Sequence, residues 1–415
     1  MSRTPAELVA ERTKRLQDAW ALRQPDRIPV NTFFSYMLAR FGGVTHQELD
    51  DNPDKAQELL EKCALYIQPD ACGGVGMFGP HASVMLGDIQ TRWPGHGQPP
   101  DQPFQFLEGE YMKAEEYDEF LDDPSDFALR KFVPRTFRNL AGLARMPSIA
   151  IFLMGYPSLG YLAQLNDPEL VASFEALAKV ARFYAEHLPR LQRNAERMMA
   201  LGFPASMGRG AFLLAPFDFT SDVLRGMRGV FLDMYRRPEK LMAAQEKGRR
   251  IMVRNAVSMA RATGARFAFI PLHRGSDGFM SLEQFKTFYW PPFKAMMLDL
   301  VNAGLTPSVF YEGMWDERLE YLRELPMGKT IGQFQRTNFE KLKETVGDIM
   351  CIGGCFPVSL LQMGSPDEIR EQTRQMCRVL GKNGGFIMGP NSSMDECNPE
   401  LVKVWVDATK EYGVY

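Results

Sequence analysis

Short apolar runs alternate with longer amphipathic stretches along most of this chain, and this alternation limits the folds open to it. Eight of the runs have the length and the flanking glycines or prolines of buried strands. They span residues 28–31, 70–74, 205–211, 267–272, 307–311, 330–334, 349–353 and 385–388. Helical periodicity follows the later runs at residues 282–302, 317–325, 338–346 and 366–380. Because strands that alternate with helices pair in parallel, the sequence predicts an α/β fold.

Local signals support the helices, and the number of strands favours a closed sheet. Pro366 is followed by Asp367 and Glu368, a typical helix start, because proline fits the first turn and acids are favoured near the positive end of the helix dipole. Glycines suited to a left-handed C′ position follow four helical stretches. They are Gly304, Gly328, Gly347 and Gly381. Eight strands with intervening helices predict a (β/α)8 TIM barrel.

One barrel domain is expected over residues 1–415, with a charged, helix-prone N-terminal extension and an insertion at about 87–134. The insertion holds a turn-rich run at 92–100 and then an acidic, aromatic stretch. The acids and the tyrosine of that stretch are Glu108, Glu110, Tyr111, Asp122 and Asp123. A long excursion with its own turn chemistry is usually functional or separately packed. On a barrel it is expected to be a lid or a dimer contact.

Composition excludes several classes of partner. The formal net charge is −3 and the sequence has no basic run, which argues against binding to nucleic acid or to an anionic membrane. No run of about 18 apolar residues is present, so a membrane span is not expected. Six cysteines are scattered along the chain and the N-terminus has no apolar signal segment. We therefore expect a cytoplasmic protein with reduced thiols that binds a small molecule or another protein.

From about residue 200 onward, four parts of the chain resemble the uroporphyrinogen decarboxylase superfamily. They are residues 210–216 with 232–239, residues 351–358 with 364–369, residues 384–400, and the end at 410–413. The superfamily includes the decarboxylase and corrinoid-dependent methyltransferases, which move methyl groups to or from a cobalamin protein. The resemblance implies a barrel with its chemistry at the C-terminal ends of the strands, and a homodimer.

Several residues differ from the family pattern, and these differences argue against two of the family's known reaction types. The decarboxylase has an arginine-rich segment after its first strand and an aspartate after its second, whereas residues 31–36 and 73–78 have neither. A polycarboxylate substrate would therefore lack a cationic clamp. The methyltransferase branch binds zinc through a histidine and two cysteines. Phe310, Glu312 and Ser392 stand at those positions here, so none of those ligands is retained.

Two strand ends carry the candidate catalytic residues. His273, Arg274 and Asp277 follow the run at 267–272 between glycines, and could supply a general acid or base with an orienting carboxylate. The alternative is a structural loop in which Arg274 pairs with Asp277. Glu312 stands at the end of the next run. It could act as a base or as a metal ligand, and the alternative is a buried acid paired with a partner.

Polar residues at or near strand ends are the expected substrate contacts. They are Asn31, Arg274, Tyr311, Gln333, Gln335, Asn391 and Ser392. A metal site is a further expectation, because His273, Glu312 and Cys355 offer the nitrogen, oxygen and sulfur ligands that zinc accepts. The alternative for Cys355 is a small buried hydrophobe.

The leading hypothesis is a methyltransferase that demethylates a small methoxylated or methylated compound, with a corrinoid protein or free cobalamin as acceptor. Glu312 and His273 would activate the heteroatom by protonation or through a metal. One alternative is a decarboxylase or lyase in which Arg274 holds the carboxylate of a small acid. Another is a non-catalytic barrel that binds a ligand.

Overall fold

A computed structural model describes residues 3–74, 80–204 and 210–415, and the chain divides into two compact units. Unit 1 comprises Met1–Met77, Arg193–Asp218 and Arg249–Tyr415, and unit 2 comprises Phe78–Gln192 and Phe219–Gly248. Parts of two sequence-based expectations, the first residues of the strand at 205–211 and the acid-free stretch at 73–78, lie outside the described residues.

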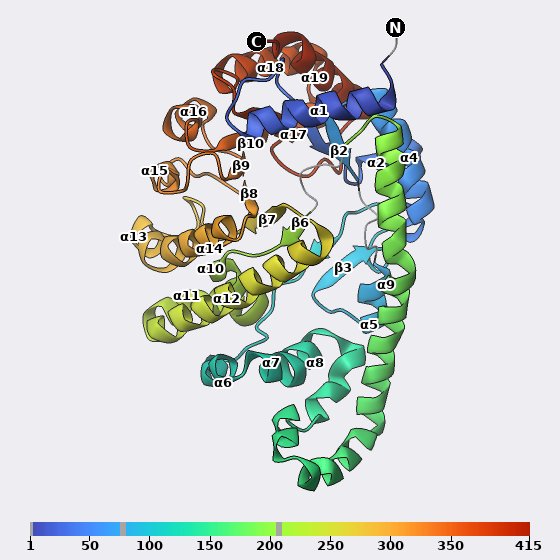
Figure 1. The fold of residues 1–415 in the computed structure, drawn as a ribbon, viewed down its shortest axis with the longest axis vertical. Coiled ribbons are helices and arrows are strands. Elements are labelled where there is room, and N and C mark those ends of the chain that lie inside the picture. The colour runs from blue at the N-terminus through green and yellow to red at the C-terminus, as the bar shows by residue number, and fades with distance from the viewer. Residues whose placement is uncertain (1–2, 75–79, 205–209) are drawn as a thin grey trace. The chain divides into compact units, whose positions relative to one another are not determined.

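Parallel strands at each of the eight predicted places make up the sheet of unit 1 (Figure 1). They are β1 (Asn31–Phe33), β2 (Ala71–Gly73), β6 (Gly210–Phe212), β7 (Phe267–Leu272), β8 (Thr306–Tyr311), β9 (Ile331–Phe334), β10 (Cys351–Phe356) and β11 (Phe386–Pro390). Strands β6 to β11 form one six-stranded sheet in the order β11-β10-β9-β8-β7-β6. The expected α/β fold with a parallel sheet is confirmed.

The remaining two strands extend this order on one side. β1 pairs with β2 in parallel, and a parallel bridge from Val30 to Met388 joins the start of β1 to β11. The resulting order is β2-β1-β11-β10-β9-β8-β7-β6. Within the described ranges, β2 and β6 share no ladder.

The two faces of the sheet differ because successive strand residues point to opposite sides. On one face, Tyr311 of β8 stacks on Phe334 of β9 with ring centroids 4.5 Å apart. Trp315 packs edge-on against Tyr311 at 4.9 Å, and Tyr289, just before helix α14 (Trp290–Asn302), packs on Trp315. This face is therefore covered by helices.

The opposite side, named here the inner face, carries the alternate residues of the strands. The strand register determines which residues belong to the inner face. For example, Phe310 pairs with Gln333 and Phe269 pairs with Phe212. The residues of the inner face used below are Asn31, Phe33, Phe212, Phe269, Ser308, Phe310, Ile331, Gln333, Cys351 and Ile387.

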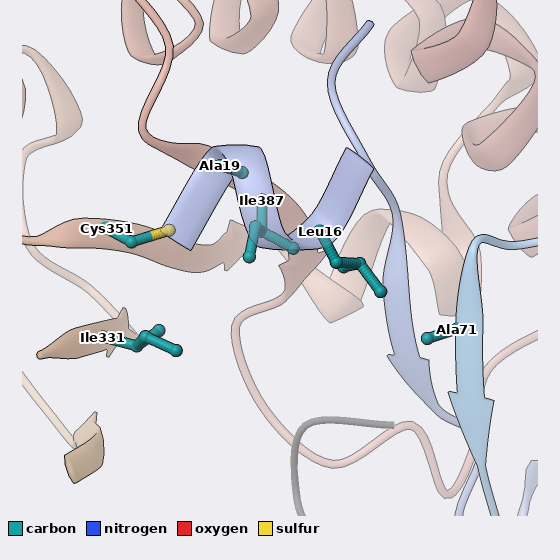
Figure 2. Packing of buried hydrophobic residues seen from close by; sticks show 6 residues of the cluster. All are labelled: Leu16, Ala19, Ala71, Ile331, Cys351 and Ile387. Atoms are coloured by element: carbon teal, nitrogen blue, oxygen red, sulfur yellow. The ribbon is translucent and has the colours of Figure 1, made fainter. Parts of the chain in front are cut away.

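Helix α1 (Pro5–Trp20) packs on the inner face at the N-terminal ends of the strands. Thr4 caps the helix, accepting from the Glu7 amide while the Glu7 carboxylate accepts from the Thr4 amide. Figure 2 shows the apolar cluster that α1 shares with β2, β9, β10 and β11. Its buried members are Leu16, Ala19, Ala71, Ile331, Cys351 and Ile387. The N-terminal extension is thus a helix that fills this end of the sheet.

Three of the four predicted helices of unit 1 are confirmed with small changes of extent, and the prediction at 317–325 shortens to the single turn α15 (Leu319–Leu322) between turns. The chain from α13 (Leu282–Gln284) through the π-helical turn η7 (Phe285–Tyr289) to α14 corresponds to the prediction at 282–302. The remaining helices of this unit are α2 (Met37–Gly42), α3 (His46–Asp51), α4 (Pro53–Ile67), α10 (Pro216–Asp218), α15 (Leu319–Leu322), α16 (Phe339–Val346), α17 (Val358–Met363), α18 (Pro366–Leu380) and α19 (Pro399–Tyr412). No described helix is both long and apolar enough to cross a membrane.

The helix-ending glycines serve two different purposes. Gly304 and Gly328 have the expected positive φ, 82° and 68°. Gly347 and Gly381 are right-handed, so the expectation was wrong for them. A Cβ at Gly347 would lie 2.5 Å from the Lys343 carbonyl oxygen, so close backbone approach explains that glycine instead.

Unit 2 contains the predicted insertion and extends well beyond it. It has a small sheet of β3 (Thr91–Pro94), β4 (Gly97–Gln98) and β5 (Gln105–Phe106). Its helical segments are α5 (His81–Leu86), η1 (Ala114–Glu116), α6 (Tyr117–Asp122), α7 (Pro124–Phe127), η2 (Ala128–Phe132), α8 (Val133–Thr136), η3 (Arg138–Arg145), η4 (Ile149–Met154), η5 (Tyr156–Asn166), η6 (Phe219–Arg225) and α11 (Gly226–Arg236). Helices α9 (Pro168–Ala200) and α12 (Pro238–Thr263) begin in this unit and end in unit 1.

Candidate functional site

His273 and Glu312 lie side by side at the C-terminal ends of β7 and β8. Leu272 pairs with Tyr311 in the ladder, so the next residue of each strand reaches the same level. The His273 Nε2 atom is 3.7 Å from Glu312 Oε1, and the two side chains are 33% and 38% exposed. An imidazole and a carboxylate at this distance and exposure can share a proton with a bound molecule.

Asp218 fixes the loop that carries His273, and the sequence analysis did not single it out. It is fully buried at the end of α10, and its carboxylate accepts from the His273 amide at 2.9 Å and from the Arg274 amide at 3.1 Å. The Tyr289 hydroxyl donates to the same carboxylate at 2.9 Å. An acid soon after the strand at 205–211, in Pro216-Phe217-Asp218, was the available signal.

Asp277 binds a residue that lies beyond β8. Its carboxylate accepts from the guanidinium of Arg318, which is fully buried, and from the Glu317 amide at 3.2 Å. Arg318 also donates to the Met280 carbonyl at 2.6 Å. Asp277 therefore ties the loop after β7 to the segment after β8, and Arg318 is the partner shown for it.

Gln335 and Asn391 connect the loops that follow four neighbouring strands, β8 to β11. The Gly313 amide donates to Gln335 Oε1 at 2.8 Å, and Asn391 Nδ2 donates to the Gln335 carbonyl at 2.9 Å. Asn391 Oδ1 in turn accepts from the Val358 amide at 3.0 Å. Both the nitrogen and the oxygen of the Asn391 side chain are thus hydrogen-bonded to backbone groups, so this side chain has a structural role. Ser392 follows it and is half-buried.

Aromatic rings and amides occupy the inner face below His273 and Glu312. Phe33 is 51% exposed and Phe212 is 64% exposed, although both lie on strands. Phe269 and Phe310 are half-buried, in contrast to the fully buried residues of the helix-covered face.

Two amides accompany these rings on the same face. Gln333 Nε2 donates to Ser308 Oγ at 3.3 Å. Among the described residues, the buried side-chain oxygen of Asn31 has no hydrogen-bond partner, a condition that a bound donor would relieve. This face therefore suits a flat or apolar molecule with a few polar groups.

Tyr311 does not fit the predicted role of a substrate contact. Its ring lies on the helix-covered face, where it is fully buried between Trp315 and Phe334. Burial raises the pKa of its hydroxyl, which stays protonated. The alternation of side chains along a strand explains why Tyr311 is not a substrate contact. Neighbouring positions face opposite sides of the sheet, so Glu312 lies on the inner face and Tyr311 on the helix-covered face.

The three proposed metal ligands are not all brought together. Among the residues that the structure describes, no three His, Cys, Asp or Glu side chains are grouped closely enough to hold an ion, so Cys355 does not complete a set with His273 and Glu312. Burial raises the pKa of the Cys355 thiol to about 12, and its sulfur donates to the Gly353 carbonyl at 3.5 Å. Phe310 and Ser392 cannot replace zinc-binding histidine and cysteine. The donor set does not fit zinc.

Unit 2 has a separate cavity of about 380 Å³ in which several ionic groups bind neighbouring residues. Its lining includes Glu108, Glu110, Arg225 and Met227. The Arg225 guanidinium, nearly fully buried, binds Glu110 and also Asp233 at 2.7 Å. Glu108 accepts from the Met227 amide at the start of α11. Glu108, Glu110 and Arg225 are thus engaged in structural contacts, and the inner face of unit 1, which carries the His273–Glu312 pair at its rim, is the better candidate site.

Comparisons with known proteins agree with the fold. A family model described as uroporphyrinogen decarboxylase matches residues 167–412. The curated proteins include no match to this chain.

Two solved structures resemble the chain to different degrees. A methyltransferase from Methanosarcina mazei is similar at a TM-score of 0.60 and 12% identity, over 97% of this chain and 98% of that one. A B12-independent methionine synthase from Shewanella sp. W3-18-1 has a TM-score of 0.32 and 12% identity, over 48% of this chain and 60% of that one. At this identity the first similarity concerns the fold alone. Because the family model spans more than half of its length, this chain belongs to the uroporphyrinogen decarboxylase family.

Proposed function

We propose that this chain is a methyltransferase that demethylates a small methoxylated or methylated compound, with a corrinoid protein or free cobalamin as methyl acceptor. The supporting observation is the His273–Glu312 pair, 3.7 Å apart at the rim of an aromatic inner face. The polycarboxylate substrate of the decarboxylase would contact the exposed rings of Phe33 and Phe212 at this face, and these rings offer no positive charge to its carboxylates.

Closure of the sheet into a (β/α)8 barrel belongs to the same proposal. The order β2-β1-β11-β10-β9-β8-β7-β6 is that of a barrel opened between its second and third strands. In a barrel the loops after the strands converge, which would place His273, Glu312 and Gln333 around one bound molecule. We further propose a homodimer, as the family resemblance implies, and a cytoplasmic location, which the six free cysteines support.

Removal of a methyl group from an ether leaves the bonding electrons on oxygen, and an alkoxide or phenoxide is a poor leaving group. Protonated His273 would donate its proton to that oxygen as the carbon–oxygen bond breaks, and the Glu312 carboxylate would stabilise the imidazolium beforehand. Asp218 would hold the donor in place through the His273 and Arg274 amides. The corrinoid, when bound, supplies the nucleophile that takes the methyl group. No step is assigned to a metal bound by this chain.

Replacement of Glu312 by glutamine tests the proposal. Glu312→Gln keeps the size of the side chain but removes the charge beside His273, so we expect turnover to fall by about 10²–10⁴-fold with folding unchanged. Transfer of the methyl group to added cobalamin or corrinoid protein can be followed by absorbance, and folding by circular dichroism. Glu320→Gln, at an exposed position of α15, is the matched control. Normal turnover of Glu312→Gln would refute the assignment.

A decarboxylase or lyase acting on a small acid is the second candidate, and Arg274 is the observation that favours it. The Arg274 backbone is fixed by Asp218, and its guanidinium lies 4.8 Å from the centre of the Phe279 ring. A guanidinium next to His273 could hold a carboxylate. Product formed without any corrinoid would favour this candidate, whereas strict corrinoid dependence would favour methyl transfer.

A further inference from the structure

Arg12 of α1 is a buried cation whose hydrogen bonds go to uncharged groups. Its side chain is 7% exposed, and its guanidinium donates to the Gly202 carbonyl at 2.7 Å and to Gln68 Oε1 at 2.8 Å. In the ranges that the structure describes, no carboxylate forms an ion pair with it, and Asp70 acts on it only at longer range. A buried charge is normally paired with an opposite one, so this arginine calls for a counter-ion.

Lys410 of α19 is a second cation of unit 1 that lacks a bound partner. It is half-buried, and the described part of the chain gives its ammonium group no hydrogen bond. The charges of two carboxylates act on it, those of Asp407 and Asp70. Asp407 is bound to Lys403 at 2.7 Å, and Asp70 is bound to two arginines. Both acids are therefore engaged with other cations.

The same surroundings make the side chain of Lys410 a strong nucleophile for a lysine. Burial first, and then the positive charge of Arg27, disfavour the ammonium form and lower its pKa from 10.5 to about 8. At pH about 8, roughly half of this amine is neutral, which is about a hundredfold more than for an ordinary lysine. Removal from water and a neighbouring cation are the two conditions that activate lysine as a nucleophile.

We propose that Lys410 is a site of reversible modification by carbon dioxide, and that the carbamate formed is the counter-ion of Arg12. The neutral amine attacks the carbon of carbon dioxide, so a nitrogen–carbon bond forms and one carbon–oxygen double bond becomes a single bond to an anionic oxygen. The nitrogen then releases one proton to water. The product is a carbamate with one negative charge, and no oxidant or reductant is needed.

The neighbouring cations favour an adduct that carries a negative charge. Acetylation would leave a neutral amide, which supplies no counter-ion to Arg12. Among the described residues, Arg12 makes two hydrogen bonds and Arg27 makes three, and a guanidinium has more N–H donors than these bonds use. A carboxylate on Lys410 can therefore be bound without displacing Asp70. Such an adduct would tie helix α19 to helix α1.

Carbon-13 NMR of the whole protein with labelled bicarbonate at pH about 8 tests this proposal. The α-amino group of the chain has a pKa near 8 and also forms a carbamate, so its resonance is the internal reference. The wild type should show a further carbamate resonance. That resonance should be lost from Lys410→Met and from Lys410→Arg, which keeps the charge. Lys382→Met, at an exposed position, is the matched control and should keep it.

Two further measurements identify the residue and the effect. Trapping with a trialkyloxonium reagent, followed by peptide mass spectrometry, should place the adduct on Lys410. Bicarbonate should also raise the Tm of the wild type but not that of Lys410→Met. A wild type with only the α-amino resonance, or a further resonance that persists in Lys410→Met, would overturn the proposal. An equal rise of Tm with phosphate and no covalent adduct would assign these cations to a free anion instead. No outcome depends on the methyltransferase activity.

Discussion

Two buried carboxylates set the local geometry of unit 1 through backbone hydrogen bonds. Asp218 holds the amides of His273 and Arg274, and Asp70 holds the amide of Val30 at 2.8 Å before β1. Both carboxylates are fully buried, and each is satisfied by several donors. A buried charge is tolerated only when it is bound in this way, so each aspartate fixes the segment whose amides it binds.

Lys410 should make the stability of the protein depend on pH. Burial, together with the nearby positive charge of Arg27, lowers the pKa of its ammonium group from 10.5 to about 8. Between these values the unfolded chain binds more protons at this position than the folded one, so the contribution of Lys410 to the free energy of unfolding should rise as pH increases from about 8 to about 10.5. The buried thiols, whose pKa values are raised, contribute in the opposite direction. The gain should be on the order of 1–3 kcal/mol.

Urea denaturation at several pH values measures this dependence. Lys410→Met removes the titrating group, and this component of the rise should then disappear. Lys382→Met, at an exposed position, should follow the wild type. If the free energies of unfolding of Lys410→Met and of the wild type change in parallel with pH, the lysine is not the cause.

Elements of unit 1 that are distant in the chain are joined at their N-terminal ends by one ionic cluster. Asp70, before β2, accepts from Arg15 of α1 at 2.6 Å and from Arg27 at 2.8 Å. Arg15 is itself buried and also binds Asp26 at 2.6 Å. The apolar contacts of α1 with the strands add to this link (Figure 2). Helix α1 is therefore an integral part of the sheet's packing.

Asp70→Ala should destabilise the protein by about 3–5 kcal/mol, because Arg15 and Arg27 lose the fully buried carboxylate that they share. Chemical denaturation at neutral pH measures the loss. Asp26→Ala is the matched control, since Asp26 also binds Arg15 but its side chain is 62% exposed. The Asp26 carboxylate is largely in contact with water, and Arg15 keeps Asp70 and Glu11 as partners in this variant, so the control should lose less stability. Equal effects of both variants would contradict the importance of burial.

At the scale of the whole molecule, the thiols are distributed unevenly. All six cysteines lie in unit 1, none forms a disulfide, and five are buried. Burial raises the pKa of Cys63, Cys351, Cys377 and Cys397 as well as of Cys355. Thiolate is the reactive form of cysteine, so these thiols should be inert while unit 1 is folded.

Labelling by Ellman's reagent at neutral pH should therefore report the unfolding of unit 1. We expect slow reaction of the native protein and rapid reaction of six thiols in denaturant. The labelling rate against denaturant concentration gives the stability of the unit. Rapid modification of several thiols in the native protein would contradict the burial described here.

The sequence by itself determined the order of strands and helices in unit 1 and the loops that carry His273 and Glu312. These follow from local patterns, because apolar periodicity and helix-capping residues act over a few positions. The resemblance of residues 210–216 and 351–358 to a known family was likewise readable from the chain, and the family match confirms it.

Only the tertiary structure decided which way those residues face and what they bind. The parallel register put Tyr311 among the helices and Glu312 beside His273. Asp277 binds Arg318, and Asp218 binds backbone amides of the loop after β7, because folding brings together segments that are far apart in the chain. Pairings of this kind depend on strand register and burial, which no local pattern specifies.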